Sequence, residues 1–419
     1  MNFPMIKWAK DLYPICRSIT GKGTEETLKY FKKLNPEFKI INFKSGSRVF
    51  DWKIPKEWNI KNSYIQHESG KKYAEFKKSN LHVVGYSTPI NKWMSKKKLL
   101  ENIFTQKDQP NSIPYVTSYY KKRWGFCLSE KEKKKLPSGN YRAFINSSLK
   151  NGNLKLSHAI LKGKSKKEIF FSSYVCHPSM VNNELSGPVL LNAIMKYIKK
   201  NYKKRKFSYR FVLLPETIGS IAYLSKYQKE MKKNILCGYN LTCVGDTRAY
   251  SYVRSRDGNS ISDFYMDKYL KKMKNFKKYE YIDRGSDERQ YCSPSVDLPI
   301  CSFSKSKFYK EYHTDKDNFK VVTQKGLMES LKVFMKIIDD LEKSIFPKTK
   351  IFCEPNLGKR NLYPTLSQKG NYKSVKLRMD LLAYSDGRKN LEFISQIINQ
   401  PIKKIAQEYK LLKSRGLLI

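Results

Sequence analysis

Residues 168–187 read EIFFSSYVCHPSMVNNELSG, an apolar run that ends in a short segment dense with polar side chains. The run IFFSSYV is typical of a buried strand, because it is mostly apolar over the length of a strand. His177 follows it directly, and the next residues, GPVLLNAIMKYIKKNY, predict a helix. A strand, a polar turn and a helix in this order indicate an α/β fold.

The same order recurs toward the C-terminus. Strands alternating with helices predict a mostly parallel sheet with helices on both faces. In such sheets ligands bind at the carboxyl ends of the strands. His177, Glu216 and Asp246 each follow a predicted strand, so we expect them at one edge of the sheet. The further predicted strands are RFVLLPE, YNLTCVG and LPICSFSK, and the further helices are SIAYLSKYQKEM and TQKGLMESLKVFMKIIDDLEK.

The segments around this core differ from it in composition and predicted secondary structure. Residues 1–45 predict helices and a strand, with Thr24 as the N-cap of the run EETLKYFKKL. Residues 46–145 predict short strands separated by Gly, Pro and Ser, with one helix over SKKKLLENIF. Residues 154–166 and 168–176 predict a hairpin.

A chain of 419 residues exceeds the roughly 250–300 residues at which single cores stop growing. We predict an α/β domain over residues 1–45 and 146–348, and a β-rich inserted domain over residues 46–145. Residues 349–419 predict a linker and three short helices. Pro401 at a helix start and Gly416 at a helix end give the last pair helix-turn-helix character.

The net charge is extreme, with 83 Lys and Arg against 37 Asp and Glu, or +46. Such a charge attracts nucleic acid or anionic lipid. Arginine, whose planar fork reads phosphates and bases, is however scarce beside lysine, and the lysines are scattered along the chain. We interpret the charge as compositional drift and as weak evidence for a nucleic-acid partner.

The cysteine pattern and the hydropathy bear on the compartment. The eight cysteines include no CxxC pair and no disulfide framework, which favours a reducing cytoplasm. The N-terminal segment lacks the apolar core of a signal peptide. No window approaches 18 apolar residues, so we expect no membrane-spanning helix.

Two of the five histidines lie where a site is expected. His177 follows the buried strand, and His313 lies in EYHTDKDNF, just before a long helix. A lone histidine is more often structural, but neutral imidazole is the commonest zinc ligand, and catalytic zinc sites use three protein ligands. Glu216, in LLPETIGS, ends an apolar strand. A carboxylate in such surroundings can have a raised pKa and take a proton, although it could also simply favour the start of the next helix.

The segments HPSMVNNELSG, PETIGS, TCVGD, GSDERQYCSP and YHTDKDNF, in this order, resemble the motif series of the di-zinc aminopeptidase-like family. Along its whole length the chain resembles bacterial polysaccharide-biosynthesis proteins with an aminopeptidase-like domain. That resemblance includes the β-rich insertion and a C-terminal winged-helix-like module. It implies a zinc-exopeptidase-like fold and zinc-dependent hydrolysis of an amide-like bond in surface polysaccharide biosynthesis.

The resemblance also implies roles for single residues. His177 matches the first metal-ligand histidine, and His313 matches the last. Glu216 matches the general base, and Asp287 matches an active-site acid near the substrate. We therefore expect Glu216 and Asp287 to be catalytic.

Three family carboxylates are missing. Asn183 stands where the family has its metal-bridging Asp, and Thr217 and Thr242 replace two further carboxylate ligands. A two-metal site needs a bridging anion, so we expect one zinc ion at most. Glu184 and Asp246 are the candidates for the remaining metal ligand, and the sequence does not choose between them.

The expected substrate is a small molecule, an aminoacyl or amino-sugar derivative. Asn183 lies at the site, and Glu288 and Arg289 follow Asp287 on a charged loop. An amine is recognised by a carboxylate and an acid by a guanidinium fork, so these three residues are candidate substrate contacts.

A second hypothesis is a metal-free pseudoenzyme that serves as a protein- or nucleic-acid-binding module. Basic residues on or beside the last helix could neutralise several phosphates. Few residues follow that helix to form a wing hairpin, so we favour a structural or protein-interaction role over DNA binding. The basic residues are Lys403, Lys404, Lys410, Lys413 and Arg415.

Overall fold

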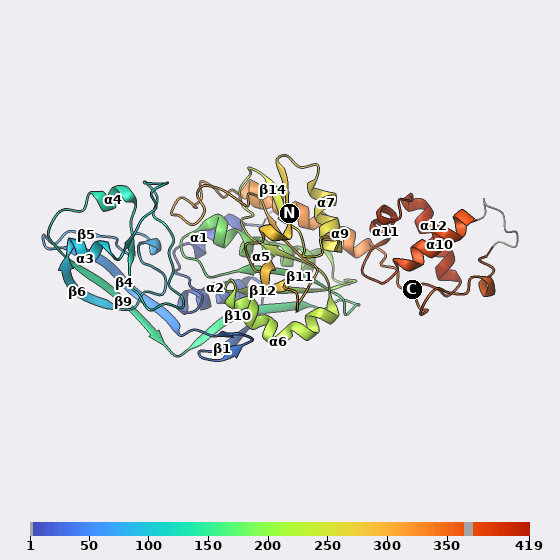
Figure 1. Cartoon of the computed structure of the whole chain (residues 1–419), viewed down its shortest axis with the longest axis horizontal. Coiled ribbons are helices and arrows are strands. Elements are labelled where there is room, and N and C mark those ends of the chain that lie inside the picture. Colours follow the sequence, from blue (N-terminus) through green and yellow to red (C-terminus); the bar gives the residue numbers. More distant parts are fainter. Residues whose placement is uncertain (1–2, 364–371) are drawn as a thin grey trace.

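The computed structural model describes residues 3–363 and 372–419. Figure 1 shows three parts in a row: a β-rich part, a central α/β part and a helical C-terminal part. In the described residues no helix is long and apolar enough to cross a membrane.

The central part is built on one eight-stranded sheet in the order β1-β10-β12-β11-β13-β16-β14-β15. Strands β12, β11, β13 and β16 are parallel, whereas β1 and β10 at one edge are antiparallel, and β14 is antiparallel to β16. The predicted α/β fold is confirmed, with a mixed sheet. The strands are β1 (Lys39–Lys44), β10 (Asn153–Leu161), β11 (Glu168–Tyr174), β12 (Ser208–Leu214), β13 (Ile235–Leu241), β14 (Tyr250–Val253), β15 (Phe276–Tyr279) and β16 (Ile300–Ser304).

The predicted hairpin between residues 154–166 and 168–176 is wrong. Strand β12 lies between β10 and β11 and pairs with both. All seven residues of β11 are buried, so this strand needs a partner along each edge, and β12 and β13 supply them. Parallel neighbours of this kind require crossover helices rather than a tight turn.

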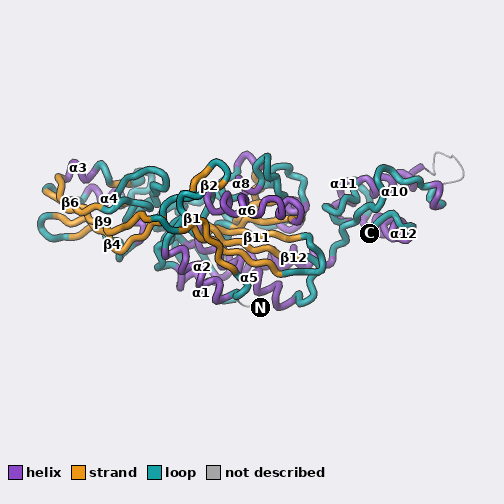
Figure 2. The backbone as a smooth tube through the Cα atoms, turned by 90° about the horizontal axis from the view of Figure 1, so that it is seen from below, coloured by secondary structure: helices purple, strands orange, loops and turns teal. Residues whose placement is uncertain are grey.

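Helices cover both faces of the sheet, as Figure 2 shows with α1, α2 and α5 on one side and α6 and α8 on the other. Alternate side chains of β11 enter different cores: Phe171 packs with α5 and α9, whereas Phe170 packs with α6. The helices are α1 (Met5–Leu12), α2 (Lys22–Leu34), α5 (Ser186–Asn201), α6 (Ile218–Asn234), α7 (Ile261–Leu270), α8 (Glu288–Tyr291) and α9 (Gln324–Lys343).

Thr24 does not cap α2, contrary to the sequence prediction. The helix begins at Lys22, after Gly21, whose φ of 99° is accessible to glycine. Thr24 lies inside the first turn, where its hydroxyl donates to the carbonyl of Ser18.

The β-rich part contains a four-stranded antiparallel sheet in the order β5-β4-β9-β6 with its own core around Ile65, Tyr141 and Ala143. It has two α-helices where one was predicted, and the second starts with a capping box of Ser129 and Glu132 that the sequence already carries. Its elements and the adjoining hairpin are β2 (Arg48–Val49), β3 (Trp52–Lys53), β4 (Glu57–His67), β5 (Lys72–Tyr73), β6 (Ile90–Ser95), α3 (Lys96–Leu100), β7 (Ile103–Phe104), β8 (Phe126–Cys127), α4 (Glu130–Lys134) and β9 (Asn140–Lys150).

The C-terminal part has the three predicted helices, α10 (Tyr372–Ala383), α11 (Leu391–Ile397) and α12 (Ile402–Ser414). They enclose a separate apolar core that includes Leu381, Ile394 and Ile405. The domain boundaries at residues 45, 145 and 348 stay a prediction.

A buried ion pair in the central sheet gives a test of this fold. The Arg210 guanidinium on β12 is fully buried and lies 2.5 and 3.0 Å from the two oxygens of Glu168 on β11. Replacing Arg210 with Met leaves Glu168 buried without its cation, so we expect a loss of about 3–5 kcal/mol of unfolding free energy. Calorimetric melting measures it. The matched control is Glu230→Gln, since the Glu230 side chain is 46% exposed and should matter little. Equal melting temperatures for both variants would refute this assignment.

Candidate active site

Four strand ends converge at one edge of the central sheet. Because β11, β12, β13 and β16 are parallel, their carboxyl ends lie together. Cys176 and His177 follow β11, Glu216 follows β12, and Thr242 follows β13. His313 lies on the long loop between β16 and α9. The parallel topology therefore brings polar side chains together at this edge of the sheet, as the sequence analysis predicted.

His177 stands at the centre of this group. Its Nδ1 lies 3.2 Å from Oε2 of Glu184, and its Nε2 lies 3.7 Å from Oε2 of Glu216. Glu184 is carried by the π-helical turn η2 (Val181–Leu185), a distortion that is frequent at functional sites. Burial disfavours a charged imidazole here, but contacts with Cys176 and Glu184 outweigh it and raise the pKa of His177.

Arg17 completes the surroundings of Glu184. The two side chains are fully buried, with Nε of Arg17 3.3 Å from Oε1 of Glu184. Arg17 also donates to the carbonyl oxygens of His177, at 3.0 Å, and of Leu12, at 2.6 Å. A buried carboxylate needs a nearby cation, and Arg17 supplies one.

His313 lies beside His177, with 5.6 Å between the ring centroids, and stacks on Tyr312 at 3.9 Å. Burial, together with the His177 charge, lowers the pKa of His313 to about 3. The imidazole is therefore neutral, which is the form that binds metals.

A metal-ligand set can be assembled from three of these residues. One ligand atom each from Cys176, His177 and Glu184 lies within 4.8 Å of the others, and all three residues are buried. Nδ1 of His177, both carboxylate oxygens of Glu184 and Nε2 of His313 are buried without a hydrogen-bond partner among the described residues. Buried polar atoms rarely stay unpaired, and imidazole, thiolate and carboxylate are zinc ligands, so this donor set fits a zinc ion.

Asp246 is placed differently from Glu184. Its carboxylate accepts hydrogen bonds from the backbone N–H groups of Arg248 and Ser306, the Ser306 hydroxyl and the Asn182 amide, at 2.7–3.2 Å. Both oxygens of Asp246 are therefore already hydrogen-bonded to nearby loops. Asp246 is also not among the three residues whose ligand atoms lie within 4.8 Å of one another.

Asn183 is held by its neighbours as well. Its side-chain amide donates to the Tyr174 hydroxyl at 3.0 Å, and its backbone N–H donates to Asp317 at 2.8 Å. Its Oδ1 is buried and has no hydrogen-bond partner among the described residues. That oxygen is available to a ligand.

Glu216 and Asp287 are two neighbouring acids, of which Asp287 is fully buried and Glu216 is partly buried. Burial raises the pKa of Glu216, against the opposing effect of the His177 charge. Burial and the Glu216 charge raise the pKa of Asp287 to about 7. Oδ1 of Asp287 accepts hydrogen bonds from the Thr217 backbone at 2.8 Å and the Ser220 hydroxyl at 2.7 Å, whereas its Oδ2 is buried and unpaired among the described residues.

The turn between Glu216 and α6 is strained. Thr217 has a φ of 63°, and the N–H of Ile218 donates to the carbonyl of Glu216 at 2.8 Å, which closes a γ-turn of the rare kind. Arg289 donates to the Thr217 hydroxyl at 2.8 Å and thereby supports this turn. Strain of this type is found where the surroundings fix a functional group.

Glu288 contacts its own loop. Its Oε1 accepts from the backbone N–H groups of Gly285, at 2.7 Å, and Ser286, at 3.1 Å, and its Oε2 accepts from the Asn240 amide at 3.3 Å. The side chain is buried, and these bonds fix the loop that carries Asp287.

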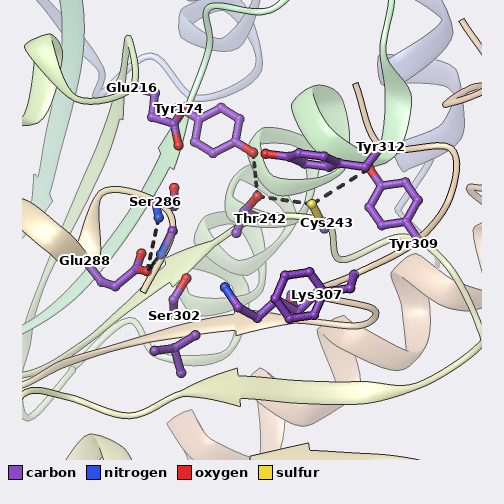
Figure 3. Close-up of a pocket in the computed structure, with 14 residues that line it drawn as sticks. Tyr174, Glu216, Thr242, Cys243, Ser286, Glu288, Ser302, Lys307, Tyr309 and Tyr312 are labelled. Carbon is purple, nitrogen blue, oxygen red and sulfur yellow. Dashed lines mark hydrogen bonds between the residues drawn. The ribbon is translucent and has the colours of Figure 1, made fainter. Parts of the chain in front are cut away.

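A pocket of about 230 Å³ opens next to Glu216, as Figure 3 shows. Aromatic rings and hydroxyl groups form most of its wall, and the Lys307 ammonium faces it. Pockets for drug-sized ligands are larger, so this one has room for a small ligand. Its lining includes Tyr174, Thr242, Ser286, Ser302, Ser304, Lys307, Phe308, Tyr309 and Tyr312.

Sequence reasoning missed several residues of this site. Cys176 carried a local signal, because it precedes His177 in the chain. Arg17 and Tyr115 carried none, since each reaches the site from a distant segment, whereas Asp317 lies in the motif YHTDKDNF, four residues after His313. Asp317 accepts from three successive N–H groups of η2, at 2.6–3.3 Å, and so fixes the start of that turn.

Comparisons with known proteins agree with this architecture. A family model described as Domain of unknown function (DUF4910) matches residues 6–344, and one described as winged helix-turn-helix matches residues 345–419. A Clostridium acetobutylicum protein, provisionally named a polysaccharide biosynthesis protein with aminopeptidase-like domain, is 39% identical over 390 residues. The match covers 91% of this chain and 88% of that relative.

Solved structures give the same result. The crystal structure of a Clostridium acetobutylicum protein, provisionally described as a peptidase, matches with a TM-score of 0.82 at 36% identity and covers 99% of this chain and 96% of that one. A zinc aminopeptidase from Bacillus subtilis matches with a TM-score of 0.58 at 12% identity, covering 80% of this chain and 93% of that one, which shows a shared fold. These matches show that the chain belongs to the DUF4910 family, with an aminopeptidase-like α/β fold and a C-terminal winged helix.

Proposed function

We propose that the protein is a metal-dependent hydrolase that uses one zinc ion and Glu216 to cleave an amide-like bond. The observation that carries this proposal is a buried set of ligand atoms on His177, Glu184 and His313 that lack a hydrogen-bond partner among the described residues, with Nε2 of His177 3.7 Å from Oε2 of Glu216. The relative's name supports a setting in polysaccharide biosynthesis. All eight cysteines are free, which supports the cytoplasm.

Zinc would be held by His177, Glu184 and Cys176, with His313 beside them. We choose Glu184 over Asp246 because the oxygens of Asp246 are already hydrogen-bonded, whereas those of Glu184 are not. A bound zinc ion supplies a Lewis acid that polarises the scissile carbonyl.

Glu216 acts as the general base and accepts a proton from the attacking water. Its raised pKa suits this task, because a base works best when its pKa lies near the working pH. Asp287 orients the Glu216 turn through the Thr217 backbone and, when protonated, offers a second proton in the same site. Arg289 positions the turn from the other side.

The substrate is a small aminoacyl or amino-sugar unit. Tyrosine rings and serine hydroxyls in one pocket suit the faces and hydroxyl groups of a sugar. The Lys307 ammonium lies near two aromatic rings, 5.2 Å from the Phe308 centroid and 5.8 Å from that of Tyr279. No carboxylate of the described residues pairs with it, so it would favour a substrate that carries an anionic group.

The second candidate is a metal-free binding module. Arg17 favours it, because this buried guanidinium already balances the charge of Glu184 without a metal ion. The C-terminal winged helix would then bind a protein partner or, as the alternative, nucleic acid.

Metal analysis separates the two candidates. We expect full-length protein loaded with zinc and then dialysed to retain about one ion per chain, since the described residues offer one such ligand set. His177→Ala and His313→Ala should lose it, whereas His158→Gln should retain it, because His158 contacts Tyr223 away from the site. Mass spectrometry of the metal gives the answer. Failure of the unaltered protein to retain any metal would favour the binding module.

Loss of the proposed base should affect turnover and not binding. Glu216→Gln keeps the shape but cannot take a proton, so we expect kcat to fall by about 10²–10⁴-fold with KM little changed. The assay compares aminoacyl anilides with N-acylated amino sugars, using zinc-loaded protein. Glu280→Gln, at an exposed carboxylate paired with Arg254, is the control. Efficient cleavage of ordinary aminoacyl anilides alone would reject the amino-sugar substrate, and unchanged kcat in the variant would reject Glu216 as base.

The raised pKa of Asp287 predicts how stability depends on pH. With a folded pKa of about 7 against 3.8 in the unfolded chain, the folded state binds more protons between these two values. Stability from this group is therefore present below pH 3.8 and is lost as the pH rises through 7. Relative to Asp287→Asn, metal-free protein should melt progressively lower from pH 4 to pH 7.5. A constant difference in melting temperature between the two proteins would contradict the shift.

A further inference from the structure

The β-rich part reaches into the candidate site through one segment. Residues 109–119, here called the strap, lie against the loop that carries His313. The backbone N–H of Tyr115 donates to the His313 carbonyl at 2.8 Å, and that of Asp315 donates to the Ile113 carbonyl at 3.0 Å. The Ile113 N–H donates to the Asp315 carboxylate at 2.8 Å, and the Gln109 amide donates to the Lys310 carbonyl at 2.5 Å. Two segments about 200 residues apart in sequence are thus tied together.

The strap holds His313 in an unfavourable backbone conformation. His313 has a φ of 57°, in the left-handed region that a side chain with a Cβ rarely adopts. Such a conformation persists only where neighbouring contacts enforce it. The bond from Tyr115 to the His313 carbonyl is one such contact, and the stacking of His313 on Tyr312 is another.

The Tyr115 ring covers both histidines. Its centroid lies 5.1 Å from that of His177 and 5.3 Å from that of His313, with interplanar angles of 75° and 82°. The Tyr115 hydroxyl lies 2.6 Å from that of Tyr119, whose ring packs edge-on against Tyr86 at 5.3 Å. Tyr86 is buried in the core beneath the sheet, so the strap is anchored at the central part.

We propose that the strap is a built-in part of this site: Tyr115 positions His313 and closes one side of the histidine pair. The inserted part is then required for the site, and ligands reach the histidines from the side of the Tyr174–Lys307 pocket. This proposal adds a positioning role for the strap to the proposed function. It depends on the proposed function only where the two histidines are taken to bind a metal ion. It requires no metal, so it can be tested separately.

The five histidines of the chain report on this arrangement. Full-length, metal-free protein is treated with diethyl pyrocarbonate, which modifies accessible neutral imidazole, and the rate at each histidine is read by peptide mass spectrometry. With Tyr115→Ala we expect the rate at His313 to rise about tenfold, because local opening no longer limits access. Tyr115→Phe keeps the ring and should restore the slow rate.

Matched controls distinguish a local effect of Tyr115 from general unfolding of the protein. Tyr120→Ala removes an exposed ring directly after the strap and should leave all rates unchanged. His67 and His82, both within the β-rich part, should stay at their original rates. If Tyr115→Ala proves unstable, Asp315→Ala cuts one tie of the strap and should accelerate His313 in the same way.

Three outcomes overturn the proposal. They are unchanged rates in Tyr115→Ala, a uniform rise at all five histidines, and rapid modification of His313 in the unaltered protein. Cobalt(II) titration then separates the two proposals: the visible spectrum of bound Co²⁺ should change in Tyr115→Ala and return in Tyr115→Phe. Absence of cobalt binding in every variant would reject the metal site, whereas the histidine rates alone still decide the strap.

Discussion

The parallel pairing of β11 with β12 on one side and β13 on the other is the constraint from which the geometry of the site follows. All seven residues of β11 are buried, and alternate side chains enter two different cores. A slip of one residue would exchange these faces and move the strand end, so the register is strongly specified. Because the strands are parallel, fixing their register also fixes His177 beside Glu216.

Charge at that strand end is balanced by a residue from the start of the chain. Arg17, between α1 and α2, bonds the His177 carbonyl and pairs with Glu184, so one side chain joins three segments. Even with Arg17 in place, buried atoms on Glu184, His177 and His313 lack a hydrogen-bond partner among the described residues. The ligand atoms without hydrogen-bond partners are compatible with a bound metal ion. Arg17 balances the charge of Glu184, so the cluster can also be stable without a metal ion.

The two additional parts relate to the site in different ways. The β-rich part sends the strap onto His313 and Tyr115 onto both histidines. The C-terminal part packs against α7 instead, where Phe264 stacks on Phe393 at 4.8 Å and Lys268 pairs with Glu392 at 2.6 Å. Figure 1 shows these parts at opposite ends of the molecule. The insertion thus contacts the candidate site, whereas the winged helix packs against the central part away from it.

The sequence by itself determined the α/β class, the strands β11, β12, β13 and β16 with the helices α5, α6 and α9, and the three C-terminal helices, because apolar periodicity is local information. It did not predict β14, α7 and β15. The sequence also indicated His177 and Glu216 as neighbours, since parallel strand ends must meet, and the family resemblance added His313. It did not reveal that β12 separates β10 from β11, because pairing partners depend on which edge remains free. Only the tertiary structure distinguished Glu184 from Asp246 as candidate metal ligands. The oxygens of Asp246 accept hydrogen bonds from Arg248 and Ser306, whereas those of Glu184 accept none among the described residues. Arg17 and Tyr115 were likewise beyond the sequence, because their contacts with His177 and His313 cross 160 and about 200 residues of chain.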